Sequence, residues 1–253
     1  MKILFLDILT GNPELRKNIN QKIYKGGSYG EHLRKLFSLK KSEWAEVDAS
    51  QKIPSDFLKF DGIVIGGSTE DPMPGSEKPW MKKIYPAIRK IIKNKIPLLG
   101  ICGGLQFTAR ALGGKVILNP GGREFGSVKI TLSQDGKKDF LFCGISKNFT
   151  AQSSHKCMVE KILPGSRLLA SSDMCGLQAL SLGDRARLLQ FHPEKTKAQL
   201  KSLAKMRKSA LIAEGFVQDE KDFKKFLASI KNTETAGKKI LKNFINFVKF
   251  DSI

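Results

Sequence analysis

The sequence predicts an α/β protein with a central, mostly parallel sheet flanked by helices, followed by a helical C-terminal extension. Three observations lead to this fold class. Short apolar runs alternate with amphipathic helical patterns up to residue 114, short strand patterns separated by turns come next, and the pattern beyond Pro193 is helical only. The 253 residues, 41% of them hydrophobic, can bury the core of one large domain with an appendage. We therefore expect a domain over residues 1–195 and an extension over residues 196–253 packed on it.

Four apolar runs in the first hundred residues predict buried strands: KILFLD, WAEVDA, FDGIVIGGS and IPLLGI. The first should be a central parallel strand that leads into a loop at Gly11, Asn12 and Pro13. The stretch YGEHLRKLFSL has apolar residues at helical spacing. In WMKKIYPAIRKIIKNK, isoleucines occupy one face and lysines the other, which indicates a helix covering the sheet. The stretch GLQFTARALGG predicts a further helix closed by two glycines.

The region from KVILN to LLQFH predicts further strands packed on or beside the main sheet. Its strand patterns are SVKITLS, FTAQSSH, RLLASS, LQALSLG and RARLLQFH. In the extension, Leu200, Leu203 and Met206 lie at helical spacing, as do Phe244 and Phe247. No internal repeat and no low-complexity segment interrupts this order.

The cysteine pattern favours a reducing compartment. The four cysteines show no paired or metal-type spacing and only three histidines are present, so we expect neither a disulfide framework nor a metal site, and no cofactor. The start, MKILFLDILTGNP, is unlike a secretory signal, and no apolar stretch is long enough to cross a bilayer. A cytoplasmic location without membrane association is the expectation.

The formal net charge of +20 is spread along the chain. Residues 195–253 hold 14 Lys and Arg against 6 Asp and Glu, and the rest of the excess lies in the first 194 residues. The sequence has no long basic block, no RNA-binding signature and no interleaved aromatic residues of the kind that stack on bases. We interpret the charge as solvated lysines, which permit weak, salt-sensitive binding to nucleic acid without making it the function.

Cys102 is the candidate nucleophile. It lies in GICGG, at the end of a predicted strand and the start of a predicted helix, where the site of an open parallel sheet is found. Gly100 and Gly104 fit the pattern of a sharp turn that exposes a nucleophile. The N-terminus of the next helix should favour the thiolate, and the Gly103 N–H is available to bind an oxyanion.

The motif QFHPE supplies a proton carrier and a group to orient it. In an extended segment His192 and Glu194 point to the same side, and Pro193 biases His192 toward that conformation. Together with Cys102 they would form a catalytic triad for attack on an amide. His32 is expected on a helix surface.

These motifs, with LGGKV, REFG, SSH and LPGSRLLASSD, occur in the same order and at similar spacing in class I glutamine amidotransferases, which the sequence resembles over residues 60–195. It is most similar to the glutaminase domain of GMP synthase. The resemblance implies a flavodoxin-like fold and a γ-glutamyl thioester on Cys102, hydrolysed with His192 as general base and Glu194 holding it.

The resemblance also implies further site residues. The second oxyanion donor falls at either Gly67 or Ser68. Gln106 corresponds to a glutamine that contacts the amino-acid end of the substrate, and the backbone around Ser154 and His155 to the strand that binds the α-carboxylate. The sequence departs from the family pattern at Cys157, where many members have an aspartate for the substrate's α-amino group.

Three functions remain open at this stage. Residues 196–253 and the stretch YGEHLRKLF resemble stand-alone members such as plant γ-glutamyl peptidases, which favours hydrolysis of glutamine or a γ-glutamyl peptide. A glutaminase subunit that delivers ammonia to a synthetase partner is the second hypothesis. The third is a basic binding protein on the same fold, which the intact set Cys102, His192 and Glu194 argues against.

Overall fold

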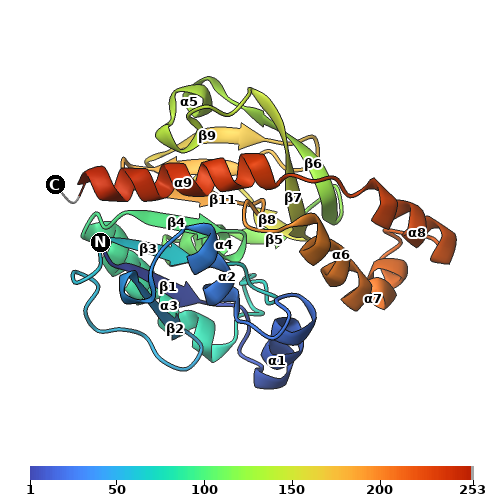
Figure 1. The fold of residues 1–253 in the computed structure, drawn as a ribbon, viewed down its shortest axis with the longest axis horizontal. Coiled ribbons are helices and arrows are strands. Elements are labelled where there is room, and N and C mark those ends of the chain that lie inside the picture. Colours follow the sequence, from blue (N-terminus) through green and yellow to red (C-terminus); the bar gives the residue numbers. More distant parts are fainter. Residues whose placement is uncertain (252–253) are drawn as a thin grey trace.

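The structure, a computed structural model, describes residues 1–251 and confirms the predicted α/β class. Nine strands of this part of the chain form one sheet in the order β2-β1-β3-β4-β11-β10-β9-β6-β7 (Figure 1). The first five in this order are parallel: β2 (Trp44–Asp48), β1 (Ile3–Asp7), β3 (Gly62–Ile65), β4 (Leu98–Ile101) and β11 (Ala186–Leu189). As predicted, β1 is a buried parallel strand, but it lies next to the edge strand β2 rather than at the centre of the sheet.

The other four strands of the large sheet run antiparallel: β10 (Ala179–Leu182), β9 (Ser166–Ser171), β6 (Glu124–Leu132) and β7 (Asn148–His155). A second, two-stranded sheet pairs β5 (Val116–Leu118) with β8 (Cys157–Val159). The strand formed by RARLLQFH, expected on or beside the main sheet, is its fifth parallel strand. It pairs with β4 and is fully buried, because all four of its residues are enclosed by neighbouring strands and helices.

Helices cover both faces of the sheet. These are α1 (Pro13–Lys22), α2 (Tyr29–Leu36), α3 (Pro79–Lys93), α4 (Gly103–Ala111) and α5 (Gln134–Lys138), with 3₁₀ turns η1 (Lys41–Glu43) and η2 (Phe140–Phe142). Alternate residues of β1 enter separate cores: Ile3 and Phe5 pack with α2, whereas Leu4 and Leu6 pack with α3 and α4. The sheet is therefore the middle of three layers.

The helix α1 replaces part of the loop expected after the first strand. Asn12 caps it by accepting a hydrogen bond from the Leu15 N–H at 3.0 Å, and Pro13 occupies the first helical position. Residues that indicate a turn also begin this helix.

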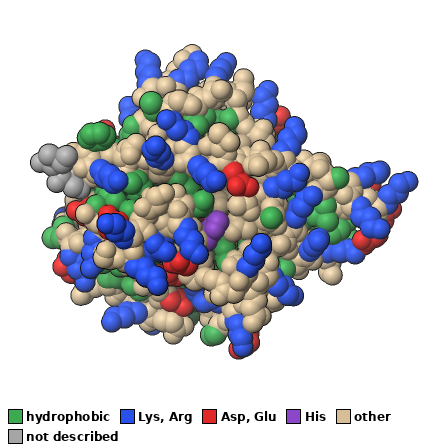
Figure 2. All heavy atoms as spheres, in the orientation of Figure 1, with side chains coloured by type: hydrophobic (Ala, Val, Ile, Leu, Met, Phe, Trp, Pro, Cys, Tyr) green, Lys and Arg blue, Asp and Glu red, His purple; other side chains and the backbone are tan. Residues whose placement is uncertain are grey.

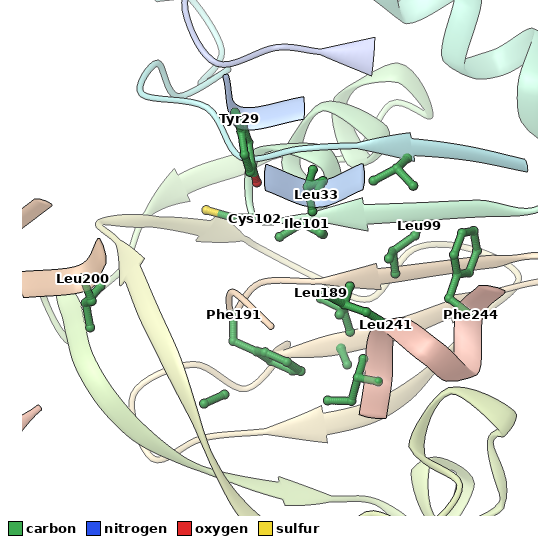
Figure 3. Close-up of a cluster of buried hydrophobic side chains, with 14 of the residues drawn as sticks. Tyr29, Leu33, Leu99, Ile101, Cys102, Leu189, Phe191, Leu200, Leu241 and Phe244 are labelled. Carbon is green, nitrogen blue, oxygen red and sulfur yellow. The ribbon is translucent and has the colours of Figure 1, made fainter. Parts of the chain in front are cut away.

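The extension is helical, as predicted: α6 (Lys197–Met206), α7 (Lys208–Ala213), α8 (Glu220–Ser229) and α9 (Glu234–Asp251). In Figure 1, α9 runs along the sheet, whereas α6, α7 and α8 project beyond one end of it. Figure 3 shows Leu241 and Phe244 of α9 beside Leu99 and Leu189 of the parallel strands, and all four are fully buried. The last helix therefore forms part of the core; the division into two domains at residue 195 stays a prediction.

Lysine and arginine side chains are scattered over the face shown in Figure 2 and form no single block on it. This fits the dispersed charge of the sequence. None of the helices described is both long and apolar enough to span a membrane.

Candidate active site

Cys102 occupies a strained turn between β4 and α4. Its φ of 51° and ψ of −97° place a non-glycine residue in a region that costs about 1–3 kcal/mol. Its N–H donates to the Leu189 carbonyl of β11 at 2.6 Å, which ties the turn to the neighbouring parallel strand. Only 5% of Cys102 is exposed (Figure 3). The sharp turn expected from GICGG is present, whereas the role of Cys102 as a nucleophile stays a prediction.

Close packing explains two glycines of the GICGG motif. A Cβ on Gly104 would lie 2.4 Å from the carbonyl oxygen of Ile65 in β3, and one on Gly103 would lie 2.6 Å from the Ser68 nitrogen. Larger residues would separate α4 from the turn after β3. The glycines thus let these two segments meet directly beside Cys102.

The segment after β11 brings His192 and Glu194 into contact. The His192 Nδ1 lies 2.7 Å from Glu194 Oε1, and both residues are buried. Since β11 pairs with β4 through Leu189 and Ile101, this segment leaves the sheet at the same edge as Cys102. We assign the ring proton to Nδ1, which then donates to the carboxylate and leaves Nε2 to accept a proton.

Two residues that the sequence did not single out complete this buried group. The Tyr29 hydroxyl donates to Glu194 Oε1 at 3.0 Å and accepts from the Gly67 N–H at 3.1 Å. The Lys195 ammonium lies 3.2 Å from the same carboxylate oxygen and 2.9 Å from His192 Nδ1. A sequence can reveal the helix that carries Tyr29 but not the residue across from it.

His32 lies half-buried rather than on a helix surface. Its Nε2 is 2.8 Å from the backbone oxygen of Glu194, because α2 packs against the segment that follows β11. The side chain thereby helps to hold the chain beside His192.

Burial and charge set the protonation states. Burial, assisted by the Lys195 charge, lowers the pKa of His192, so its imidazole is neutral at pH 7. Although burial opposes it, interactions with His192 and with the Lys195 charge hold the pKa of Glu194 well below its usual range. Glu194 is therefore an anion that orients a neutral base.

The thiolate expected at Cys102 is not favoured in this structure. Burial raises the pKa of Cys102 to about 12, and this outweighs the opposing effects of the Lys195 charge and the Gly103 N–H. At pH 7 the group is a thiol, so its proton has to be removed as it reacts.

The two candidates for the second oxyanion donor differ in their hydrogen bonds. The Gly67 N–H is already bonded to Tyr29, whereas the Ser68 N–H makes no hydrogen bond with any residue from 1 to 251. Ser68 also faces the start of α4, as its 2.6 Å approach to the Cβ position of Gly103 shows. Of the two candidates, the Ser68 amide is therefore the one left without a hydrogen bond; the roles of Ser68 and Gly103 as oxyanion donors stay predictions.

The other predicted residues lie around the same centre. Gln106 is buried, and its side-chain amide donates to the Cys157 carbonyl of β8 at 3.0 Å. Ser154 lines a narrow cleft of about 40 Å³ together with His192 and Ser68. The His155 side chain instead bonds the buried Glu124 at 2.9 Å, which leaves only its backbone for a ligand. Among the residues described, no cluster of three or more His, Cys, Asp or Glu is placed to hold a metal.

Two charged residues from outside the predicted motifs also act on Cys102 through their charges. Arg207, at the corner between α6 and α7, lines the cleft with His192 and Ser154. Asp71, in the loop after β3, lies beside Cys157: burial and the Asp71 carboxylate raise the pKa of that thiol to about 12. Only the fold brings the loop and the extension together here.

A parallel sheet that ends in a strained cysteine, next to the strand that leads into a buried histidine–glutamate pair, defines an α/β protein with a candidate active site at the carboxyl ends of its strands. The chain belongs to the class I glutamine amidotransferase family, whose sequence profile, Glutamine amidotransferase class-I, matches residues 26–207.

Individual relatives include proteins with different names. γ-Glutamyl peptidase 3 of Arabidopsis thaliana is 31% identical over 154 residues, which are 60% of this chain and 61% of that protein. One subunit of the glutamine-hydrolysing GMP synthase of Sulfurisphaera tokodaii is 32% identical over 176 residues, 68% of this chain and 87% of the relative. The aligned part thus spans about three fifths of the peptidase.

Solved structures agree on the fold. A glutamine amidotransferase from Thermotoga maritima superposes with a TM-score of 0.75 at 19% sequence identity, covering 98% of this chain and 97% of that one.

Proposed function

We propose that the protein hydrolyses a γ-glutamyl amide bond, in glutamine or a γ-glutamyl peptide, through Cys102, His192 and Glu194. The observation that carries this proposal is the strained turn at Cys102. This turn directly follows β4, and the neighbouring strand β11 leads into the His192–Glu194 pair. Strain of this kind persists only where surrounding packing holds it, and it clusters at functional sites.

The reaction follows from the protonation states. Neutral His192 accepts the Cys102 proton while the sulfur attacks the γ-carbonyl carbon, and the Gly103 and Ser68 N–H groups stabilise the oxyanion. His192 then returns the proton to the leaving nitrogen as the C–N bond breaks. Water, deprotonated by His192, attacks the resulting thioester, and glutamate leaves as the thiol is restored.

The choice of a leaving group larger than ammonia rests on the relatives, because the cleft of about 40 Å³ lined by His192, Ser68 and Ser154 has room for little more than a water molecule. The peptidase relatives are consistent with this choice.

Turnover by the purified chain alone tests the proposal. We expect a γ-glutamyl dipeptide or glutathione to give a kcat/KM comparable to or better than that of glutamine, and Cys102→Ser to abolish turnover of all three, because an alcohol is far less ionised than a thiol. Glutamine hydrolysis without any peptide turnover would contradict the peptidase preference.

The second candidate, an ammonia-delivering subunit, is favoured by the match to a GMP synthase subunit over 87% of its length. It predicts that the chain releases ammonia from glutamine only after a synthetase partner is added. A pull-down followed by ammonia-release assays with and without the captured partner would distinguish it from the hydrolase. Under either function, we propose that the protein is located in the cytoplasm.

A further inference from the structure

The corner between α6 and α7 presents Arg207 to the cleft that is lined by His192, Ser68 and Ser154. The backbone N–H of Arg207 donates to the carbonyls of Leu203 and Ala204, which fixes the corner, and Leu200 and Leu211 anchor the two helices in the core. Packing of α6 and α7 against the core therefore fixes the position of the Arg207 backbone.

The Arg207 guanidinium differs from its neighbour Arg123. Arg123 forms a two-pronged ion pair with Glu214, at 2.5 and 2.8 Å. No hydrogen bond or ion pair joins the Arg207 guanidinium to any residue within 1–251, although the group is half-buried. Burial lowers the pKa of Arg207 from its usual value, but the group keeps its charge at pH 7. The charges of Asp71 and Glu214 act on this guanidinium from a distance, but neither carboxylate is bound to it, so its N–H donors are available to an anionic ligand.

A carboxylate of opposite charge, that of Asp71, acts on the same centre. Asp71 lies beside Cys157, and its charge and that of Arg207 both reach the Cys102 thiol. Asp71 and Arg207 are not ion-paired with each other in the structure described. Two opposite charges held apart near the nucleophile match the two charges on the α-carbon of a glutamyl group.

We propose that Arg207 binds the α-carboxylate and Asp71 the α-amino group of the γ-glutamyl donor, so that the helical extension forms part of the active site. This inference rests on the proposed function. The arginine that would bind the α-carboxylate lines the same cleft as Ser154. Asp71 would bind the α-amino group, which the neighbouring thiol of Cys157 cannot do.

The carboxylate of a peptide leaving group is the competing ligand for Arg207. The two assignments predict different substrate effects. If Arg207 binds the donor end, its loss slows glutamine and γ-glutamyl dipeptides alike, because both contain that end. If it binds the leaving group, glutamine is spared.

The test compares Arg207→Ala and Asp71→Asn with substrates that lack one charge. We expect each variant to lose about 10- to 100-fold in kcat/KM for glutamine and for a γ-glutamyl dipeptide, mainly through KM. Arg207→Ala should no longer distinguish glutamine from its α-methyl ester, and Asp71→Asn should no longer distinguish glutamine from N-acetylglutamine. Arg207→Lys should recover part of the loss. Exposed residues provide matched controls, Lys205→Ala and Asp173→Asn, which should behave as wild type.

The ratio of two labelling rates at Cys102 tests the inference even if a variant is less stable, because loss of folded protein lowers both rates. Cys102 is labelled with diazo-oxo-norleucine, which has the glutamyl end, and with iodoacetamide, which does not. The ratio of the two rates should fall about 10-fold or more in Arg207→Ala. An unchanged ratio, or dipeptide turnover lost with glutamine turnover intact, overturns the inference alone. Failure of the wild-type protein to react with the glutamine analogue or to turn over any γ-glutamyl compound overturns the proposed function, and this inference with it.

Discussion

The parallel half of the sheet (β2, β1, β3, β4 and β11) and its antiparallel half (β10, β9, β6 and β7) are built differently. The parallel strands are 4 or 5 residues long, and β1, β3, β4 and β11 are buried throughout. The antiparallel half contains β6, with 9 residues, and β7, with 8, in both of which buried and less buried positions mix. A strand buried on both faces offers only its ends to a substrate, and the site lies at those ends.

The buried carboxylates Glu194 and Glu124, one in each half, also have different surroundings. Glu194 faces a base, a lysine and a tyrosine that serve the proposed reaction. Glu124 of β6 instead accepts hydrogen bonds from Ser153 and Gln178 and contacts His155. We infer that strain in the parallel half serves chemistry, whereas the hydrogen-bond network around Glu124 in the antiparallel half serves stability.

The largest expected effect separates activity from stability at Cys102. Cys102→Gly should lower kcat by about 10⁴-fold or more, because the nucleophile is lost. It should also relieve the strain of the positive φ. The matched control is Cys175→Gly, at a buried cysteine without that conformation. Urea denaturation should show Cys102→Gly to be less destabilised than the control by about 1–3 kcal/mol. Equal losses would show that the turn is not strained.

The next effect concerns the pH dependence of kcat/KM. The acid limb reports protonation of His192, whose pKa is lowered by burial and by Lys195. Lys195→Met removes the positive charge and should raise that pKa, so the acid limb should move to higher pH. Lys205→Met, at an exposed position of α6, is the control and should leave the profile unchanged. A limb that stays in place or moves to lower pH in Lys195→Met would contradict the role given to this lysine.

A smaller effect on activity, but a clear one on stability, is expected in the antiparallel half. Although burial opposes it, the hydrogen bond from His155 and further donors lower the pKa of Glu124. Its stabilising effect is therefore present above the ordinary carboxyl pKa and is lost as pH falls through the lowered value. Glu124→Gln should cost about 1–3 kcal/mol at pH 7 and less below pH ~4, by urea denaturation. A deficit that grows on acidification would contradict this assignment.

The smallest effect concerns the net charge. Because lysines are dispersed over the surface in Figure 2, binding to nucleic acid should involve phosphate contacts only and weaken steeply with salt. Fluorescence anisotropy with unrelated oligonucleotides should give similar, weak affinities. Sequence-selective binding that persists at about 0.3 M salt would show a recognition surface that the fold does not suggest.

Local patterns predicted most of the fold. Apolar runs identified the strands of the parallel half, and the isoleucine face of α3 identified its packing side. The place of β11 beside β4 could not be read, because hydrogen-bond partners in a sheet are set by tertiary packing. Helix α1 was missed although Asn12 and Pro13 are good helix-start residues, since the same residues also favour turns.

In the site, too, local motifs could be predicted from the sequence, whereas contacts between distant segments could not. The motifs around Cys102 and His192 could be recognised because each lies within a few residues. The contacts of Tyr29, Lys195, Asp71 and Arg207 could not, since most of these residues meet the site from distant segments. The protonation of Cys102 was predicted from its helix alone, and burial by the remaining elements reversed it.

Covalent labelling tests the central claim most directly. The wild-type protein and Cys102→Ala are treated with diazo-oxo-norleucine and examined by intact-mass and peptide mass spectrometry. The proposed mechanism predicts one adduct per chain, located on Cys102, and no adduct on Cys102→Ala even though Cys143, Cys157 and Cys175 remain. Equal labelling of the variant, or an adduct on another residue, would contradict Cys102 as the nucleophile.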